Sequence, residues 1–503
     1  MIKVIEVIQK IKSRITKKEI SKILIIFGIW MRGSGLAAAP LWYDEAFSIQ
    51  MARLSFIQLI QATWLDFSPA LQYLIIKPWI YFNNPWMARI PSLLASILGL
   101  AVIWEMMDDW EVTDNQRLWI SALTLLPGFY WMAQDARVYA MIGLLYMISF
   151  WLLMGGQYKW AAVIMGMMIW GHLVGFILVV SLVVVNLIRD WMLQGMLDIR
   201  IIFKSTARKT IGSGLAAIGI GIPAMLPILM SPVVTEYKLN PINLAQILDS
   251  IHAAIFVEIL PAGWINITAG ILILIYIALA GLITLTALYH WGIILKDKES
   301  KYIIEDDIVI TNGLLVVVPI ILMIIISATV KPILFYRPLQ ILLLPFILWI
   351  GSATAMQEYK PQKLILPIAL AAAIILAQIS WSPRAKGSNL DHYADLINQD
   401  PGPVMYATGS VALPFDLYVD QPGWIAAYQE DNSLGSDELL ALFGYKQRDP
   451  GAWADWIIWP QNELLSPELV EDLEILTAEM DLVGVVEYWQ IGDTEIWHRE
   501  AGQ

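Results

Sequence analysis

Two adjacent carboxylates, Asp44 and Glu45, stand in the otherwise apolar and aromatic stretch LWYDEAFS at residues 41–48. An ionised carboxylate beside a bilayer loses hydration and needs a partner, so residues placed in this way are candidates for function. A carboxylate can also remove a proton from an attacking hydroxyl group. The alternative is an ordinary interfacial pair that faces water.

Cationic and other polar side chains occur where later apolar runs begin or end. Arginine suits a phosphate group because its planar fork can bond two oxygens at once. Taken singly, an arginine could be an anchor at the membrane surface, and a histidine could be a hydrogen-bonded structural residue. The residues are Arg89 in ARIPS, Asp135, Arg137 and Tyr139 in AQDARVYAM, His172 in GHLVGF, and Lys331 and Arg337 in KPILFYRPLQ.

The elements that must position these side chains are membrane helices. Of the 503 residues, 58% are apolar and only 15% are charged, which is typical of a protein that has the bilayer as its solvent. The stretch 159–188 is too long for one span, and Gly171-His172 interrupts it, so we predict two short helices there. The sequence then predicts about eleven spans. The others lie near residues 21–38, 89–107, 117–132, 137–155, 211–230, 263–288, 308–328, 334–354 and 362–380.

The distribution of lysine and arginine predicts the topology. The loops 189–210 and 289–307 are rich in both residues, which places them in the cytoplasm. The same parity places residues 39–88, the segment 134–137, His172 and everything after residue 381 outside. Residues 1–20 alternate basic and aliphatic positions and predict an amphipathic cytoplasmic segment. We therefore predict a multi-pass protein of the plasma (inner) membrane with a cytoplasmic N-terminus, whose transmembrane domain covers residues 21–381.

Residues 382–503 predict a small extracytoplasmic α/β domain. From Arg384 onwards, 22 acidic residues stand against five basic ones, and a shortage of Lys and Arg suits an outer domain, although solubility alone would explain the sign. The absence of cysteine excludes disulfides and thiolate metal sites. We expect no nucleic-acid partner. Apolar alternation and turn residues predict strands at 403–406 and 455–459, a helix at 467–480, and a hairpin from 482–490 and 495–498.

The order of these motifs resembles a known family. LWYDEAFS, SPALQYL, ARIPS, AQDARVYAM, GHLVGF and FYRPLQILLLP are similar to motifs of bacterial and archaeal members of the protein O-mannosyltransferase and lipid A aminoarabinose transferase superfamily. The resemblance covers residues 40–180 and 330–350. It implies an all-α polytopic GT-C membrane fold. It also implies inverting transfer of a sugar from a polyprenyl-phosphate donor to a hydroxyl of a protein, lipid or cell-envelope glycan on the outer face.

The resemblance also implies roles for single residues. Asp44 would activate the acceptor hydroxyl, and Glu45 would orient the catalytic site. No metal ligand is carried over, because the His-Pro-Pro-Leu element of many relatives is replaced here by the sequence at residues 67–71, FSPAL, which leaves any metal requirement open. Burial should raise the pKa of Asp44 and a nearby arginine should lower it; the sequence does not decide between them. The substrate-binding set would be Arg89, Asp135, Arg137, Tyr139, His172, Lys331 and Arg337.

Two other classes of function fit parts of the sequence. A lipid or sugar transporter would also be polytopic, but transporters tend to carry inverted repeats and helices broken at the bilayer midplane. The sequence has no evident internal repeat, and its polar motifs lie at the ends of the spans. A membrane scaffold with an acidic tail would leave the shared side of the polar motifs unexplained. Transfer of a lipid-linked sugar is therefore the leading hypothesis.

Overall fold

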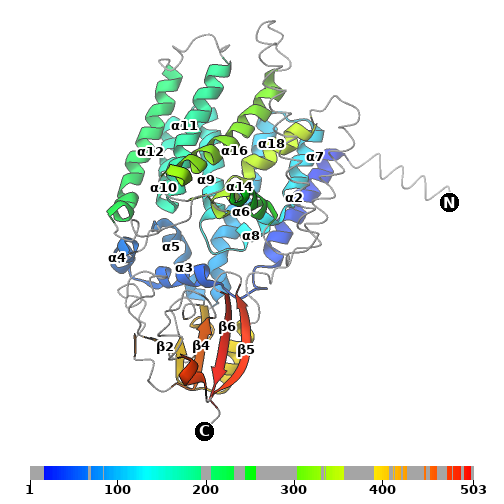
Figure 1. The fold of residues 1–503 in the computed structure, drawn as a ribbon. Helices are drawn as coiled ribbons and strands as arrows, with labels where there is room; N and C mark the ends of the chain where they lie inside the picture. The colour runs from blue at the N-terminus through cyan, green and yellow to red at the C-terminus, as the bar shows by residue number, and fades with distance from the viewer. Residues whose placement is uncertain are drawn as a thin grey trace, which may run out of the picture.

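The protein folds into a helical part and a smaller C-terminal sheet domain (Figure 1). The structure is a computed structural model. The residues that it describes are 16–65, 69–82, 84–193, 205–230, 244–256, 303–329, 333–334, 336–355, 390–406, 412, 414–420, 423–426, 447–448, 454–460, 473–478, 480–488 and 492–499. Most of the segment 1–20, the predicted spans 263–288 and 362–380, and Lys331 lie outside these residues.

Long apolar helices make the chain a multi-pass membrane protein. Within the described residues, four helical stretches are long and apolar enough to cross a membrane, namely Pro85–Asp109, Val174–Met192, Ser205–Leu226 and Asp307–Thr329. The total of about eleven spans stays a prediction. The helices of this part are α2 (Lys17–Ser34), α6 (Ile90–Asp109), α7 (Asp114–Leu123), α8 (Pro127–Ala133), α9 (Tyr139–Met154), α10 (Tyr158–Gly171), α11 (Val174–Leu193), α12 (Ser205–Met230), α14 (Leu244–Phe256), α16 (Ile303–Thr329), α17 (Tyr336–Gln340) and α18 (Leu343–Ala355).

The predicted division of residues 159–188 is confirmed, because α10 ends at Gly171 and α11 begins at Val174. The predicted span 117–132 is not one continuous helix. It consists of α7 and α8, with the break at residues 124–126, where Leu126 is extended and Pro127 begins α8. Proline has no N–H to donate to the preceding turn, so it starts a helix more readily than it continues one. The segment 334–354 is likewise divided, into α17 and α18.

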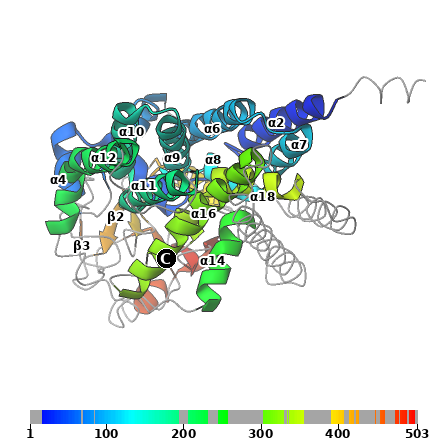
Figure 2. The same cartoon turned by 90° about the horizontal axis from the view of Figure 1, so that it is seen from above.

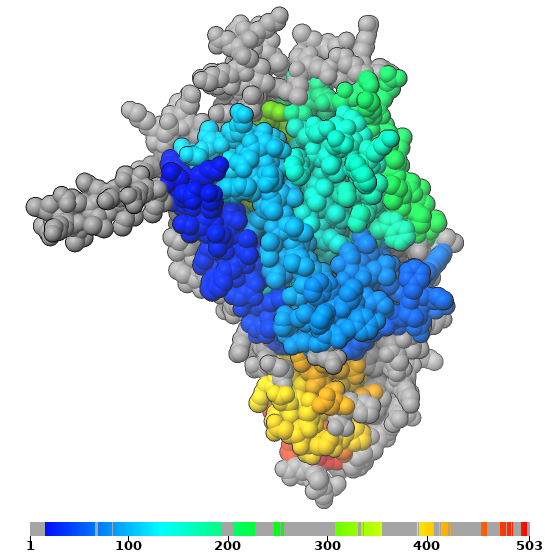
Figure 3. All heavy atoms as spheres, turned by 180° about the vertical axis from the view of Figure 1, so that it is seen from behind, coloured from blue at the N-terminus to red at the C-terminus, as the bar shows by residue number. Residues whose placement is uncertain are grey.

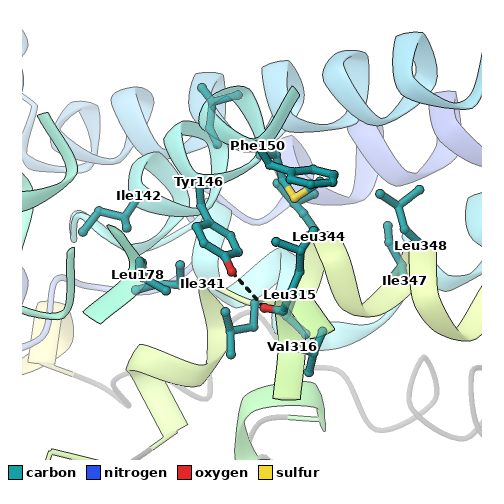
Figure 4. Packing of buried hydrophobic residues seen from close by; sticks show 14 of the residues in the cluster. Ile142, Tyr146, Phe150, Leu178, Leu315, Val316, Ile341, Leu344, Ile347 and Leu348 are labelled. Atoms are coloured by element: carbon teal, nitrogen blue, oxygen red, sulfur yellow. Dashed lines mark hydrogen bonds between the residues drawn. The ribbon is translucent and has the colours of Figure 1, made fainter. Parts of the chain in front are cut away.

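The helices share one apolar core. The side chains of α9, α16 and α18 interlock there, and the hydroxyl of Tyr146 in α9 donates to the carbonyl oxygen of Leu315 in α16 at 2.9 Å (Figure 4). This bond satisfies a polar group that would be costly to bury alone. Seen from above, α16 runs between α11 and α18 (Figure 2).

The chain between α2 and α6, residues 35–89, is here called the first loop. It contains α3 (Tyr43–Arg53), α4 (Phe56–Leu65), α5 (Leu71–Ile76) and the short 3-10 helices η1 (Ile80–Phe82) and η2 (Pro85–Arg89). Its buried side chains form a cluster separate from the bundle core. The loop lies between the helical part and the C-terminal domain (Figure 3). It therefore forms a platform at one end of the bundle.

Within its described residues, the C-terminal domain contains a six-stranded sheet in the order β3-β2-β1-β4-β6-β5. Strands β1 to β4 are parallel, and β6 runs antiparallel to both β4 and β5. The predicted strands and hairpin are confirmed; of the predicted helix 467–480, residues 473–477 are helical and residues 467–472 lie outside the described residues. The elements are α20 (Leu390–Gln399), β1 (Val404–Tyr406), β2 (Gly423–Ala426), β3 (Gln447–Arg448), β4 (Trp456–Pro460), β5 (Asp481–Tyr488) and β6 (Gly492–His498).

Candidate functional site

Glu45 and Arg89 form a fully buried ion pair that anchors the first loop. Arg89 Nε donates to Glu45 Oε1 at 2.7 Å, and its Nη2 donates to Oε2 at 2.6 Å. The remaining N–H groups of Arg89 bond to the carbonyl oxygens of Leu36, Ala39 and Pro40 at 2.7 to 3.1 Å. Glu45 also accepts the backbone N–H of Ala136 at 2.8 Å. All five donors of the guanidinium group are thereby used by the protein itself.

Asp44 points to a different arginine. Successive residues of a helix point about 100° apart, so Asp44 and Glu45 in the first turn of α3 face different surroundings. Arg337 at the start of α17 donates from Nη1 to Asp44 Oδ2. The side chains of Arg337 and Asp44 are 12% and 18% exposed, in contrast to 1% and 0% for Arg89 and Glu45. The Asp44 pair is thus the more accessible of the two.

Aromatic residues hold the Arg337 guanidinium group in place. The centre of that group lies 4.3 Å from the ring centroid of Trp42, a cation–π distance. Nε of Arg337 donates to the hydroxyl of Tyr336 at 2.9 Å. The indole N–H of Trp42 donates to Asp135 Oδ1 at 3.2 Å. Asp135 therefore acts on the site indirectly, because it binds Trp42, the ring over which Arg337 lies.

Arg137 approaches Asp44 from the turn before α9 and is incompletely bonded. Its Nη1 makes only long contacts, at 3.5 Å to the Asp44 carbonyl oxygen and 3.4 Å to Ser48 Oγ. Its Nε is buried and has no hydrogen-bond partner among the described residues. A buried donor without a partner is costly, and such groups at a cleft are often completed by a ligand.

The charges around Asp44 decide whether its pKa is raised or lowered, which the sequence did not. Burial raises the pKa of Asp44, but attraction to Arg337 and Arg137 and the hydrogen bond from Arg337 outweigh it, and the pKa lies below its ordinary value. Asp44 is therefore ionised at neutral pH. In this state it is a poor base, because both arginines stabilise its charge.

His172 lies in the turn between α10 and α11, beside Tyr139. Its ring centroid is 5.6 Å from that of Tyr139, and its Nδ1 accepts the backbone N–H of Val174 at 3.1 Å. Burial, with a smaller contribution from Arg137, lowers the pKa of His172 to about 4. The imidazole is therefore neutral, and because Nδ1 is an acceptor its proton is on Nε2.

Eight of the nine residues in the sequence-derived set lie at this end of the bundle, and Lys331 lies outside the described residues. Trp42, Tyr336 and Ser48, which contact the arginines, were not singled out from the sequence. Trp42 and Tyr336 adjoin predicted site residues, and an aromatic ring beside a buried charge is the signal that could have found them. Among the described residues, no group of three or more His, Asp or Glu side chains could hold a metal ion.

Comparison with known proteins gives matches to solved structures. No family model matches the sequence, and no curated protein matches it. The crystal structure of ArnT from Cupriavidus metallidurans in the apo state matches over 94% of this chain and 97% of that chain, with a TM-score of 0.42 and 11% sequence identity. The match extends over nearly the whole chain at low sequence identity.

Proposed function

We propose that this protein is an inverting glycosyltransferase. It moves a sugar from a polyprenyl-phosphate carrier to an acceptor hydroxyl at the outer face of the membrane. The observation that carries the proposal is an ionised carboxylate, Asp44, held between two arginines of which one has a buried unpartnered donor. The motifs that resemble those of lipid-linked sugar transferases are the same residues that meet at this place.

The two arginines suit a phosphate group that arrives at the membrane surface. Arg137 offers Nε without competition from a described residue. Arg337 lies over the ring of Trp42 and can turn one edge from Asp44 to a phosphate oxygen without losing that contact. A dianionic or monoanionic phosphate would compete with a single carboxylate for both guanidinium groups. Donor binding would thus draw positive charge away from Asp44.

This exchange would activate the base. As the phosphate engages Arg337 and Arg137, the pKa of Asp44 rises, because burial is no longer opposed to the same extent. Asp44 then takes the proton of the acceptor hydroxyl while the acceptor oxygen bonds to the anomeric carbon of the sugar. The bond from that carbon to the phosphate oxygen breaks, the polyprenyl phosphate leaves with the bonding electrons, and the arginines stabilise its charge. Attack opposite the leaving group inverts the configuration.

The remaining residues fall into two groups. We propose that Glu45, Arg89 and Asp135 position the site, since protein partners bind each of them. Tyr139 and His172 line the side of the site beside Arg137 and present a hydroxyl and an Nε2–H to the substrate. Lys331 remains a candidate for the phosphate from its place in the sequence. The sugar donor is a substrate, and the proposal requires no resident cofactor.

Replacement of Asp44 by Asn tests the proposal. The amide keeps the shape of the side chain but cannot accept a proton, so transfer from polyprenyl-phosphate sugars in membranes should fall by about 10²- to 10⁴-fold. Asp108→Asn is the matched control, because Asp108 is 42% exposed and pairs with Arg117 at the end of α6, far in the fold from α3. Transfer at the wild-type rate by intact Asp44→Asn protein would overturn the assignment.

A further inference from the structure

The C-terminal domain contacts the first loop next to the candidate catalytic residue. In the segment that follows β1, the hydroxyl of Tyr418 accepts the backbone N–H of Leu41 at 2.8 Å. Asp416 Oδ2 accepts from Gln50 of α3 at 3.4 Å. Leu417 and Tyr418 also pack against the buried cluster of the first loop. Figure 1 shows α3 directly beside the sheet domain.

Tyr418 is firmly held on its own side of the contact. Phe415 and Val419 are buried in the core of the C-terminal domain, and Tyr418 packs against that core as well. The backbone N–H groups of Tyr418 and Val419 both donate to the Phe415 carbonyl oxygen at 2.9 Å. Nδ2 of Asn398 in α20 donates to the Tyr418 carbonyl oxygen at 2.9 Å. The backbone of Tyr418 is therefore held by its own domain, while its side chain packs against both that domain and the first loop.

The partner of Tyr418 lies in an irregular linker, residues 35–42, between α2 and α3. Buried backbone groups need a hydrogen-bond partner, and here side chains supply it. Arg89 donates to three carbonyl oxygens of the linker, and Glu45 Oε2 accepts the N–H of Trp42 at 3.3 Å. Leu41 is 1% exposed, and its N–H is bonded by Tyr418. Tyr418 thus completes a set of anchors whose other members, Glu45 and Arg89, belong to the first loop itself.

We propose that Tyr418 is a positioning residue through which the C-terminal domain holds the catalytic segment. Leu41 directly precedes Trp42, the ring under Arg337, and lies three residues before Asp44. A shift of the Leu41 backbone would move both groups relative to a bound donor. The C-terminal domain is then a part of the active site and not a separate cap. The catalytic side of this inference rests on the proposed function, whereas the contact itself does not.

Hydrogen–deuterium exchange of the full-length protein tests the contact without any substrate. Tyr418→Phe retains the packing of the ring but removes the acceptor, so exchange of the Leu41 amide should become about tenfold faster or more. The matched control is Tyr406→Phe. Tyr406 is buried in the same domain, and its hydroxyl has no hydrogen-bond partner among the described residues. Each variant is measured at an equal interval below its own melting temperature, so that a general loss of stability does not imitate the effect.

Sugar transfer by the same variants tests the positioning role. Tyr418→Phe should lower kcat by about tenfold, equivalent to about 1.4 kcal/mol, with the donor KM changed by less than about twofold. Tyr406→Phe should retain the wild-type kcat. Unchanged Leu41 exchange in Tyr418→Phe, or equal acceleration in Tyr406→Phe, overturns the inference. Faster exchange in Tyr418→Phe together with wild-type kcat overturns the positioning role. Absence of sugar transfer in the wild-type protein refutes the proposed function, and the exchange result then decides whether the contact exists.

Discussion

Asp44 and Glu45 are neighbours in sequence, and the structure predicts that their replacement will have opposite consequences. Glu45→Gln retains size but removes the charge that balances Arg89. Glu45 is 0% exposed and accepts four hydrogen bonds: two from Arg89, one from Ala136 and one from Trp42. An amide nitrogen in place of one oxygen would face N–H donors, and the guanidinium group would be left buried without a counter-charge.

The size of the effect follows from burial. Removal of one partner from a buried ion pair costs about 3–5 kcal/mol of folding free energy. In a chain of this length, 1 kcal/mol corresponds to roughly 1–2 °C in Tm, so Glu45→Gln should melt roughly 3–10 °C below the wild type. Asp44→Asn should cost at most about 1.5 kcal/mol, the low end for one charge-assisted hydrogen bond. Arg337 is partly exposed and retains Tyr336 and Trp42.

Thermal unfolding of the purified variants, followed by tryptophan fluorescence, and sugar transfer well below Tm separate the two roles. We expect Glu45→Gln to be unstable but active when folded, and Asp44→Asn to be nearly as stable as the wild type but inactive. Glu19→Gln is the control, because Glu19 is 52% exposed and pairs with Lys22 at the surface. If Glu45→Gln melts like the wild type and has lost transfer, Glu45 takes part in the chemistry and the division of roles is wrong.

Three further predictions concern charge and topology. Arg137→Gln should move the acid limb of the kcat/KM profile to higher pH, since one of the cations that lower the Asp44 pKa is lost; a limb that does not move would count against the pairing. Because the pKa of His172 is lowered in the folded protein, the unfolded chain binds this proton more readily, and the contribution of His172 to stability should decline as pH falls from about 6.5 to about 4. Measured by pH-dependent melting, the decline should be weaker in His172→Asn, which retains an acceptor for the first N–H of α11. In this cysteine-free chain, Arg200→Cys should resist an impermeant thiol reagent in intact cells and Glu430→Cys should react, and the reverse pattern would invert the predicted topology.

Hydropathy and charge predicted which segments form helices and strands better than they predicted where a helix is interrupted. The division at His172 could be predicted because a single span would have placed a basic loop on the outer side. The break before Pro127 was missed, because the residues around it are as apolar as those of a continuous span and a hydropathy window averages over a three-residue turn. In the C-terminal domain, alternation and Gly492-Asp493 gave the hairpin. Strand β2 was not predicted, and β3 has only two residues, too few to leave a pattern.

The sequence could name candidate site residues but not their partners. Asp44 and Arg337 are 293 positions apart, and topology alone places them on one side without saying that they meet. The motif gave Asp44 and Glu45 different roles but not different partners, because the sequence does not show that the rotation of about 100° between them on a helix turns each toward its own arginine. Tyr418 lies in a segment without any motif, and only the contact with Leu41 relates it to the site.

The arrangement separates groups that can change partners from groups that cannot. Glu45 and Arg89 are buried and saturated by each other and by the backbone, so exchange there would cost several hydrogen bonds at once. Asp44, Arg337 and Arg137 are held by fewer or longer contacts and are partly exposed. A charged substrate can therefore rearrange these three side chains while the backbone that carries Asp44 stays fixed. Such a division is what preorganised catalysis requires, since the rigid set holds the reacting geometry and the exchangeable set responds to the charge of the donor and of the leaving group.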